Sequence, residues 1–154
     1  MIIRTLREKE LAALLRLYAL LHPEDLRLDP ESPHVRRLWQ QMSADPHVRC
    51  YTAEIDGDIV ATCTLTIILN LTRSARPYGL IENVFTDESF RRHGIASALL
   101  RRALTEAWDA GCYKVMLLTG SEKEEVLHFY ELAGFRRGVK TGFIAYPGQK
   151  EPRP

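Results

Sequence analysis

The sequence has few cysteines, and their arrangement excludes two common kinds of site. Cys50, Cys63 and Cys112 are odd in number and scattered, with no CxxC pair and no histidine at metal-ligand spacing. The five histidines form neither an HxH nor an HExxH pattern. We therefore expect no metal, and we interpret the three cysteines as reduced, mostly buried thiols of a cytoplasmic protein.

Long hydrophobic runs and an excess of one charge are also missing. The longest uncharged run, residues 59–72, has 14 residues, whereas a membrane helix needs about 20. The first residues are soon followed by charges and do not resemble a secretory signal. With 21 Lys and Arg against 20 Asp and Glu, the formal net charge is +1. We expect no nucleic-acid partner and no membrane partner.

What the sequence does contain is typical of one globular domain. It has 154 residues, of which 45% are apolar and 27% charged. A chain of this length can bury a core without disulfides or metals. We expect residues 1–146 to form one domain and residues 147–154 a polar C-terminal tail.

The spacing of apolar residues predicts four helices. The first covers about residues 7–22 and is opened by a capping box that begins at Thr5. The others are expected over residues 33–45, 94–110 and 121–134.

Alternating and continuous apolar patterns predict the strands. They lie at residues 1–4, 47–55, 59–71, 78–86 and 112–119, with one or two closing strands in 135–146. Asp56-Gly57 is a strong signal for a two-residue hairpin. The expected fold class is therefore α/β, with a mixed central sheet flanked by helices. Residues 78–119 form a strand, a helix and a second strand, which is a parallel crossover.

The loop before the third helix carries the clearest chemical signal. It reads Arg91-Arg92-His93-Gly94-Ile95-Ala96, so small residues stand where the helix begins. A helix N-terminus offers unpaired N–H groups and partial positive charge, which suit a pyrophosphate. The loop is neither a Walker A motif nor a GxGxxG motif. The alternative is a helix that merely follows a basic loop.

Two motifs give the sequence a specific resemblance. Arg91-x-x-Gly94-x-Ala96 resembles the Gln/Arg-x-x-Gly-x-Gly/Ala motif of the GNAT acetyltransferase family. Phe129-Tyr130-Glu131-Leu132-Ala133-Gly134-Phe135 resembles its Phe-Tyr-Glu-x-x-Gly-Phe motif. The resemblance implies a single GNAT-type domain in which two parallel strands, 78–86 and 112–119, splay apart. Acetyl-CoA is then the co-substrate, and it binds in this wedge.

The resemblance also implies roles for particular residues. Backbone groups of Phe85 and Thr86 bind the pantetheine arm, and amides from Arg92 to Ser97 hold the pyrophosphate. Tyr130 protonates the leaving CoA thiolate, with a core aromatic as the alternative. Many members carry an Asn where this sequence has Lys123. The full cofactor-binding set is Phe85, Thr86, Arg91, Arg92, His93, Gly94, Ile95, Ala96 and Ser97.

Glu82 is an unusual residue for the middle of a strand. Glu is disfavoured in strands, and a buried carboxylate needs a partner or a purpose. Burial would raise its pKa toward neutral, which suits a general base. The Ile-Glu-Asn-Val run also resembles the Ile-Glu-Asp-Ile run of glucosamine-phosphate N-acetyltransferases. The alternative is a salt-bridged or edge-exposed Glu82. Asn83 is expected to face away from it.

The acceptor is less well defined. The acidic connector near Asp25 can attract a cationic amine, or it is a solvated loop. Arg73 and Arg76 can recognise a phosphate or carboxylate. The resulting hypothesis is an N-acetyltransferase acting on a small-molecule or protein amine, with Glu82 as general base and Tyr130 as general acid. The alternative is an acyl-CoA-binding sensor module without turnover. Apolar residues in 135–146, together with the resemblance, favour a homodimer.

Overall fold

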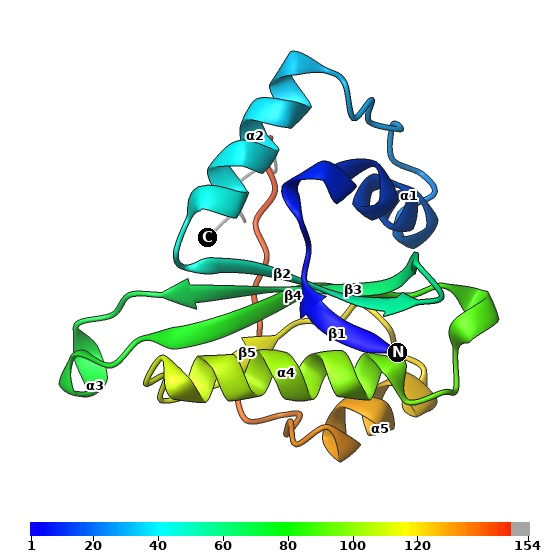
Figure 1. Ribbon diagram of the computed structural model, residues 1–154. Coiled ribbons are helices and arrows are strands. Elements are labelled where there is room, and N and C mark those ends of the chain that lie inside the picture. The colour runs from blue at the N-terminus through cyan, green and yellow to red at the C-terminus, as the bar shows by residue number, and fades with distance from the viewer. Residues whose placement is uncertain (149–154) are drawn as a thin grey trace. The chain divides into compact units, whose positions relative to one another are not determined.

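The computed structural model describes residues 1–148, and within them five strands form one sheet in the order β1-β2-β3-β4-β5 (Figure 1). The strands β1 to β4 pair antiparallel, and β4 and β5 pair parallel. This confirms the predicted α/β class with a mixed sheet. The strands are β1 (Ile2–Thr5), β2 (Val48–Ile55), β3 (Asp58–Ile68), β4 (Tyr78–Thr86) and β5 (Val115–Leu117).

The chain separates into two compact units, Met1–Leu117 and Leu118–Pro154. The first unit contains the sheet and most of the helices, and the second contains α5 (Glu124–Leu132). The expected tail, residues 147–154, lies for its greater part outside the described residues. The other helical segments are η1 (Glu8–Glu10), α1 (Leu11–Leu21), α2 (Pro33–Ala44), α3 (Thr72–Ala75), η2 (Glu88–Phe90) and α4 (Ile95–Asp109).

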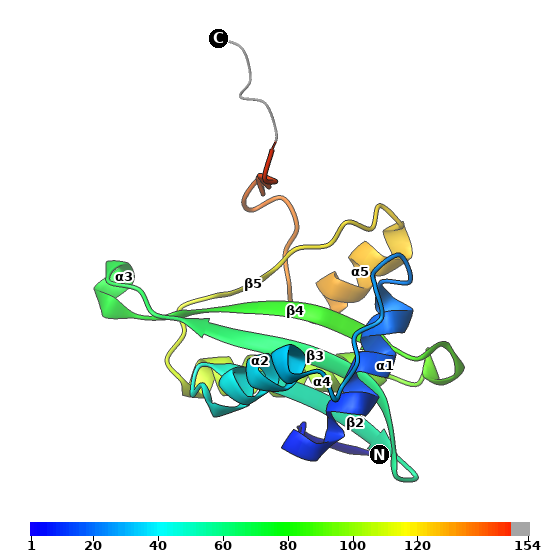
Figure 2. The same ribbon diagram turned by 90° about the horizontal axis from the view of Figure 1, so that it is seen from above.

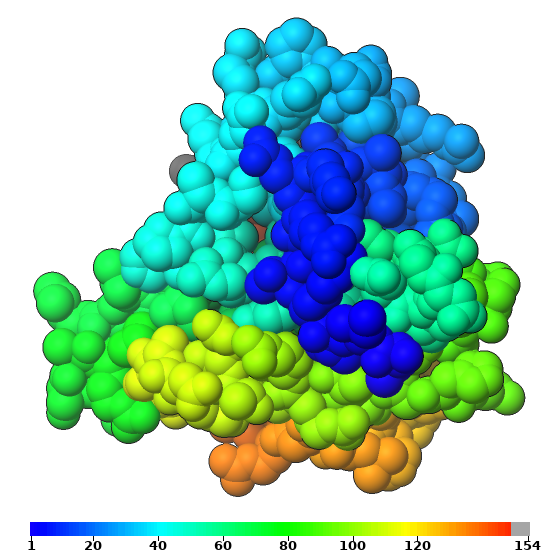
Figure 3. Space-filling view, viewed as in Figure 1, coloured from blue at the N-terminus to red at the C-terminus, as the bar shows by residue number. Residues whose placement is uncertain are grey.

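The helices of the first unit cover both faces of the sheet. Figures 1 and 2 show α1 and α2 on one face and α4 on the other. On the α4 face, Leu99, Leu100 and Ala103 are fully buried, which is the stripe that the helical spacing predicted. On the α1 face, Leu17 packs with Ile59 and Phe85. Figure 3 shows the dark-blue N-terminal residues lying between the cyan α2 and the yellow-green α4.

The hairpin between β2 and β3 follows the prediction. Asp56 and Gly57 both have positive φ, 51° and 89°, as a type I′ turn requires. Asp can adopt this conformation at modest cost, and Gly adopts it freely.

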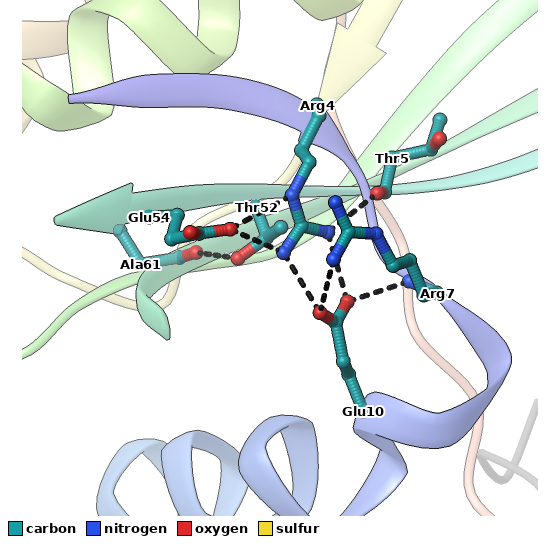
Figure 4. Close-up of polar contacts among 7 residues, drawn as sticks. All are labelled: Arg4, Thr5, Arg7, Glu10, Thr52, Glu54 and Ala61. Carbon is teal, nitrogen blue, oxygen red and sulfur yellow. Dashed lines mark hydrogen bonds and ion pairs between the residues drawn. The ribbon is translucent and has the colours of Figure 1, made fainter. Parts of the chain in front are cut away.

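The first helix begins later than predicted, and the capping box at Thr5 is wrong. Thr5 is still the last paired residue of β1, opposite Tyr51, so it cannot cap a helix. The backbone N–H of Arg7 instead donates to Glu10 Oε2 at 2.8 Å. Glu10 also accepts from Arg4, which bridges it to Glu54 on β2 (Figure 4). Thr5 is therefore kept in the sheet by its pairing with β2, and the first helical segment begins only at Glu8.

The later strands are shorter than predicted. β3 ends at Ile68, and β5 has three residues instead of the eight expected. No strand is found in residues 135–148, so the expected closing strands are wrong for the part of the chain that is described. A strand needs a ladder partner, and a lone two-stranded ribbon is marginally stable. Gly138, with a φ of 73°, also places a left-handed turn in this segment.

Candidate active site

The parallel pairing of β4 and β5 stops in the middle of β4. Gly79 pairs with Val115 and Ile81 with Leu117, and the described sheet has no β5 partner for β4 beyond that point. A Cβ added at Gly79 would lie 3.1 Å from side-chain atoms of both Leu65 and Val115. Glycine therefore allows the two strands to meet here. Beyond Ile81, the β4 edge that includes Phe85 and Thr86 has no strand partner on this side within residues 1–117, and a free strand edge can pair with an extended ligand.

The loop after β4 presents unpaired amides at the start of α4. Arg92 and Gly94 have positive φ, 65° and 74°, and Gly94 is the N-cap of α4. Within residues 1–148, the N–H groups of residues 92–97 donate to no backbone carbonyl. A Cβ at Gly94 would meet nothing within 4 Å. Unpaired donors around open space at a helix N-terminus fit a pyrophosphate.

The side chains of this loop differ in what they can do. Those of Arg92 and His93 are exposed, whereas Ile95 is buried and offers only its backbone. The Arg91 guanidinium turns back onto its own chain. It donates to the Thr86 carbonyl at 3.2 Å and to Glu88 at 3.0 Å. Arg91 therefore holds the loop against the end of β4, and a direct contact with the cofactor stays a prediction.

Arg16 on α1 also holds this loop, and sequence reasoning missed it. Its Nη1 donates to Asp87 Oδ2 at 3.1 Å, and its Nη2 donates to the Ile59 carbonyl at 2.7 Å. The other carboxylate oxygen of Asp87 accepts from the Ser89 N–H at 3.2 Å and starts η2. The Asp-x-Ser pattern after β4 is visible in the sequence as a turn signal. Its partner 71 residues away is not.

The predicted burial of Glu82 is wrong. Glu82 pairs with Thr64 across β3 and β4, which places it on the α1 face of the sheet, but its side chain is exposed. The side chain projects from the face that α1 covers, and α1, which reaches Thr64 through Tyr18, does not bury it. The carboxylate therefore stands at the mouth of the splay, where a substrate can reach it.

Asn83 does not face away from Glu82, as the alternation predicted. It has a φ of 54°, and the pairing of β3 with β4 shifts register between Thr62 and Thr64. This is a β-bulge, which re-aims the side chains that follow. The Asn83 side chain lies near enough to the hydroxyl of Tyr18 on α1 to lower the pKa of that hydroxyl. Sequence alternation cannot reveal a bulge of this kind.

Tyr130 lies in the second unit, on α5. Its ring packs against Phe129, with centroids 5.0 Å apart, and against Phe135, at 6.3 Å. The Phe135 N–H donates to the Tyr130 carbonyl at 3.1 Å, and Gly134 has a φ of 98°. The Phe-Tyr-Glu-x-x-Gly-Phe motif thus builds the C-terminal turn of α5. The role of Tyr130 as a proton donor stays a prediction.

The predicted acceptor residues are dispersed. Asp25 is exposed in the connector between α1 and α2, and Arg73 is exposed in α3. Arg73 stands in a left-handed turn with Ser74 and Ala75, all at positive φ. The Arg76 guanidinium donates to the carbonyls of Gly111 and Cys112, both at 3.1 Å, and recognition of an anion by Arg76 stays a prediction.

The described residues contain no cluster of three or more His, Cys, Asp or Glu that could hold a metal. All three cysteines are free and buried. Burial raises the pKa of Cys63 to about 12 and also raises the pKa of Cys50 and Cys112. These thiols are poor nucleophiles at neutral pH. Over the same part of the chain, the helices are too short or too polar to cross a bilayer.

Comparisons with known proteins agree with this geometry. The sequence pattern of the acetyltransferase (GNAT) family matches residues 12–135. A glucosamine 6-phosphate N-acetyltransferase of Trypanosoma brucei brucei is 31% identical over 134 residues, covering 87% of this chain and 88% of that protein. A solved structure of a putative acetyltransferase from Agrobacterium tumefaciens str. C58 superposes with a TM-score of 0.88 at 41% identity, covering 95% and 99% of the two chains. The structure of a Trypanosoma brucei acetyltransferase superposes with a TM-score of 0.77 at 28% identity, over 94% and 99%.

Proposed function

Because the chain belongs to the acetyltransferase (GNAT) family, an acetyl-CoA-dependent family, we propose that it transfers an acetyl group to a primary amine of a small molecule. The observation that carries the proposal is that a β4 segment without a β5 partner is followed, after the short η2 segment, by the unpaired amides of residues 92–97. An extended pantetheine arm needs an open strand edge, and a pyrophosphate needs unpaired donors.

We assign cofactor binding to both parts of this edge. Backbone groups of Phe85 and Thr86 take the pantetheine arm, and the amides of residues 92–97 take the pyrophosphate. Arg92 and His93 are exposed beside these amides and add donors for the phosphates. Arg91 supports the loop through its contact with the Thr86 carbonyl.

The proposed reaction is direct transfer without a covalent enzyme intermediate. An amine arrives protonated at neutral pH and must lose a proton before it can attack. Glu82, directly or through a water, accepts that proton, and the neutral nitrogen attacks the thioester carbonyl. A backbone N–H near Phe85 stabilises the oxyanion while the C–S bond breaks. Tyr130 delivers a proton to the thiolate, so the products are an amide and free CoA.

The first acceptor to test is an amino-sugar phosphate. The T. brucei relative at 31% identity is named for glucosamine 6-phosphate, and both chains are covered almost throughout. Glu82 is exposed at the mouth of the splay, where its carboxylate can meet the ammonium group of such an acceptor. The exposed Asp25 and Arg73 are proposed as acceptor contacts of opposite charge.

A thiol-release assay with acetyl-CoA tests the function. The panel holds glucosamine 6-phosphate, glucosamine, a polyamine, an aminoglycoside and a peptide with a free N-terminus. Release with a small amine supports the proposal and identifies the acceptor class, whereas release only with the peptide points to a protein substrate. Binding of CoA by calorimetry with no release across the panel favours the sensor module instead. Absence of both CoA binding and thiol release contradicts the proposal.

We further propose that the protein is a cytoplasmic homodimer. Phe143, Ile144 and Tyr146 are largely exposed, and apolar side chains grouped in this way favour contact with a second copy. The free, buried thiols suit a reducing compartment. Light scattering on the purified protein tests the oligomer, and a monomer at micromolar concentration contradicts it.

A further inference from the structure

The hydroxyl of Tyr18 lies over the part of the sheet that carries Glu82. Tyr18 is on α1, and its Oη stands 3.3 Å from Thr64 Oγ1 on β3. Thr64 is 5% exposed and is the cross-strand partner of Glu82. A buried tyrosine hydroxyl needs a polar partner, and the partner here is the residue paired with Glu82.

The same hydroxyl also lies near the residue at the bulge. Asn83 has a φ of 54°, a left-handed conformation that Asn adopts more readily than most residues but that is foreign to a regular strand. Such a conformation persists only where its surroundings hold it. The Tyr18 hydroxyl supplies a restraint of this kind, because it stands 3.3 Å from Thr64 Oγ1 at the register shift and near enough to the Asn83 side chain to have its pKa lowered by it.

The bulge determines where neighbouring side chains of β4 point. Without it, Glu82 and Phe85 would lie on opposite faces, because their separation is odd. With it, both lie on the α1 face, since Glu82 pairs with Thr64 and Phe85 pairs with Thr62. The bulge therefore brings the proposed base and the proposed oxyanion-binding segment onto one face.

The hydrogen-bonding capacity of Tyr18 fits this position. Burial raises the pKa of its hydroxyl to about 12, so the hydroxyl stays protonated throughout the neutral range. A protonated hydroxyl has one donor and two acceptor sites. It can therefore contact Thr64 and Asn83 at the same time.

We propose that Tyr18 is a positioning residue for acetyl transfer, which holds the bulge at Asn83 and through it the carboxylate of Glu82. The inference rests on the proposed function. It assigns to Tyr18 no contact with either substrate. Its effect is expected mainly on the chemical step, because the unpaired amides of residues 92–97, which are proposed to bind the pyrophosphate, lie outside this contact.

Steady-state kinetics of Tyr18→Phe test the inference, with the acceptor that the amine panel identifies. Loss of one hydrogen bond in the site predicts a fall in kcat of about three- to tenfold, with the KM for acetyl-CoA unchanged. Tyr51→Phe is the matched control. Tyr51 is also buried, but its ring lies on the α4 face below Arg102, and it should keep full kcat.

A double-mutant cycle tests the route through Asn83. Asn83→Gly removes the side-chain amide and keeps a residue that accepts positive φ. The pair Tyr18→Phe and Asn83→Gly should lower kcat no further than the slower single variant, because both remove one contact. If Asn83→Gly fails to fold, Thr64→Val replaces it. Its control is Thr62→Val, because the buried Thr62 hydroxyl has no hydrogen-bond partner among the described residues.

The outcomes separate this inference from the proposed function. An active wild type with unchanged kcat in Tyr18→Phe overturns the inference alone. Equal losses in Tyr18→Phe and Tyr51→Phe, or additive losses in the cycle, also overturn it, because they indicate general destabilisation. A wild type that acetylates no amine overturns the proposed function and this inference with it.

Discussion

Arg16 and Asp87 join the first helix to the cofactor loop by an ion pair of 3.1 Å across 71 residues of sequence. The loop that follows Asp87 carries the unpaired amides of residues 92–97. Arg16→Ala should therefore raise the KM for acetyl-CoA about two- to fivefold, the equivalent of up to about 1 kcal/mol for a half-exposed pair. The kcat should not change. The control is Arg36→Ala, which breaks an exposed ion pair between Arg36 on α2 and Glu31 in the preceding connector. An equal rise in the KM for acetyl-CoA in the two variants would contradict the prediction.

Gly94 and Gly57 form a matched pair for testing the anion site. Both have positive φ, and a Cβ at either would meet nothing within 4 Å. Alanine at each should lower the free energy of unfolding by roughly 1–2 kcal/mol, because the left-handed conformation strains it. Gly94→Ala should in addition weaken CoA binding by about tenfold or more, because relief of the strain reorients the amides. Calorimetry measures the affinity of both variants for CoA. Equal affinities would show that Gly94 is not part of the CoA-binding site.

Arg4 links β1, η1 and β2 through Glu10 and Glu54 (Figure 4). Arg4→Met should lower the free energy of unfolding at pH 7 by about 1.5–3 kcal/mol, since two carboxylates lose a charged hydrogen-bond donor. The Arg4 hydrogen bond holds the pKa of Glu10 below its ordinary value of 4.5.

The sign of the resulting pH dependence follows from that depressed pKa. The stabilisation by Glu10 is complete above pH 4.5 and is lost as the pH falls through the lower folded value. Urea unfolding should therefore show a large difference between wild type and Arg4→Met at pH 7 and a smaller one at pH 3. A difference that grows toward low pH would show that the network does not act through Glu10.

Glu82→Gln tests the proposed base. The variant should lose about a hundredfold or more of kcat, the usual contribution of general base catalysis. Because the Gln amide cannot accept the proton, the loss should be in kcat, with the KM for acetyl-CoA little changed. Glu122→Gln changes an exposed carboxylate of the second unit and should have full activity. A pH–rate profile of Glu82→Gln identical to wild type would exclude Glu82 as the base.

Tyr130→Phe tests the proposed proton donor. It should lower kcat about ten- to a hundredfold and leave CoA binding intact, because the ring contacts with Phe129 and Phe135 do not involve the hydroxyl. Tyr113→Phe, a change in the aromatic pair with Tyr78, is the control. Unchanged turnover in Tyr130→Phe would leave this tyrosine as a packing residue of α5.

Elements with strong local signals were predictable from the sequence. The stripe of α4, the Asp56-Gly57 turn and the order of strands and helices all depend on contacts within a few residues. The anion site at residues 91–96 was predictable for the same reason, because unpaired N–H groups are a property of any helix N-terminus. These signals also carry the two motifs from which the family was predicted, and the family match confirms that prediction.

Three features came from the tertiary structure alone. They are the exposure of Glu82, the bulge at Asn83 and the ion pair between Arg16 and Asp87. Exposure of Glu82 depends on how much of the sheet α1 covers, which is a property of tertiary packing. Positive φ at Asn83 accompanies the register shift between β3 and β4. Each of these joins residues far apart in the chain, and periodicity carries no information about such pairs. The sequence by itself thus determined the scaffold and the phosphate loop, because both are local. The arrangement of the proposed base came only from the packed sheet.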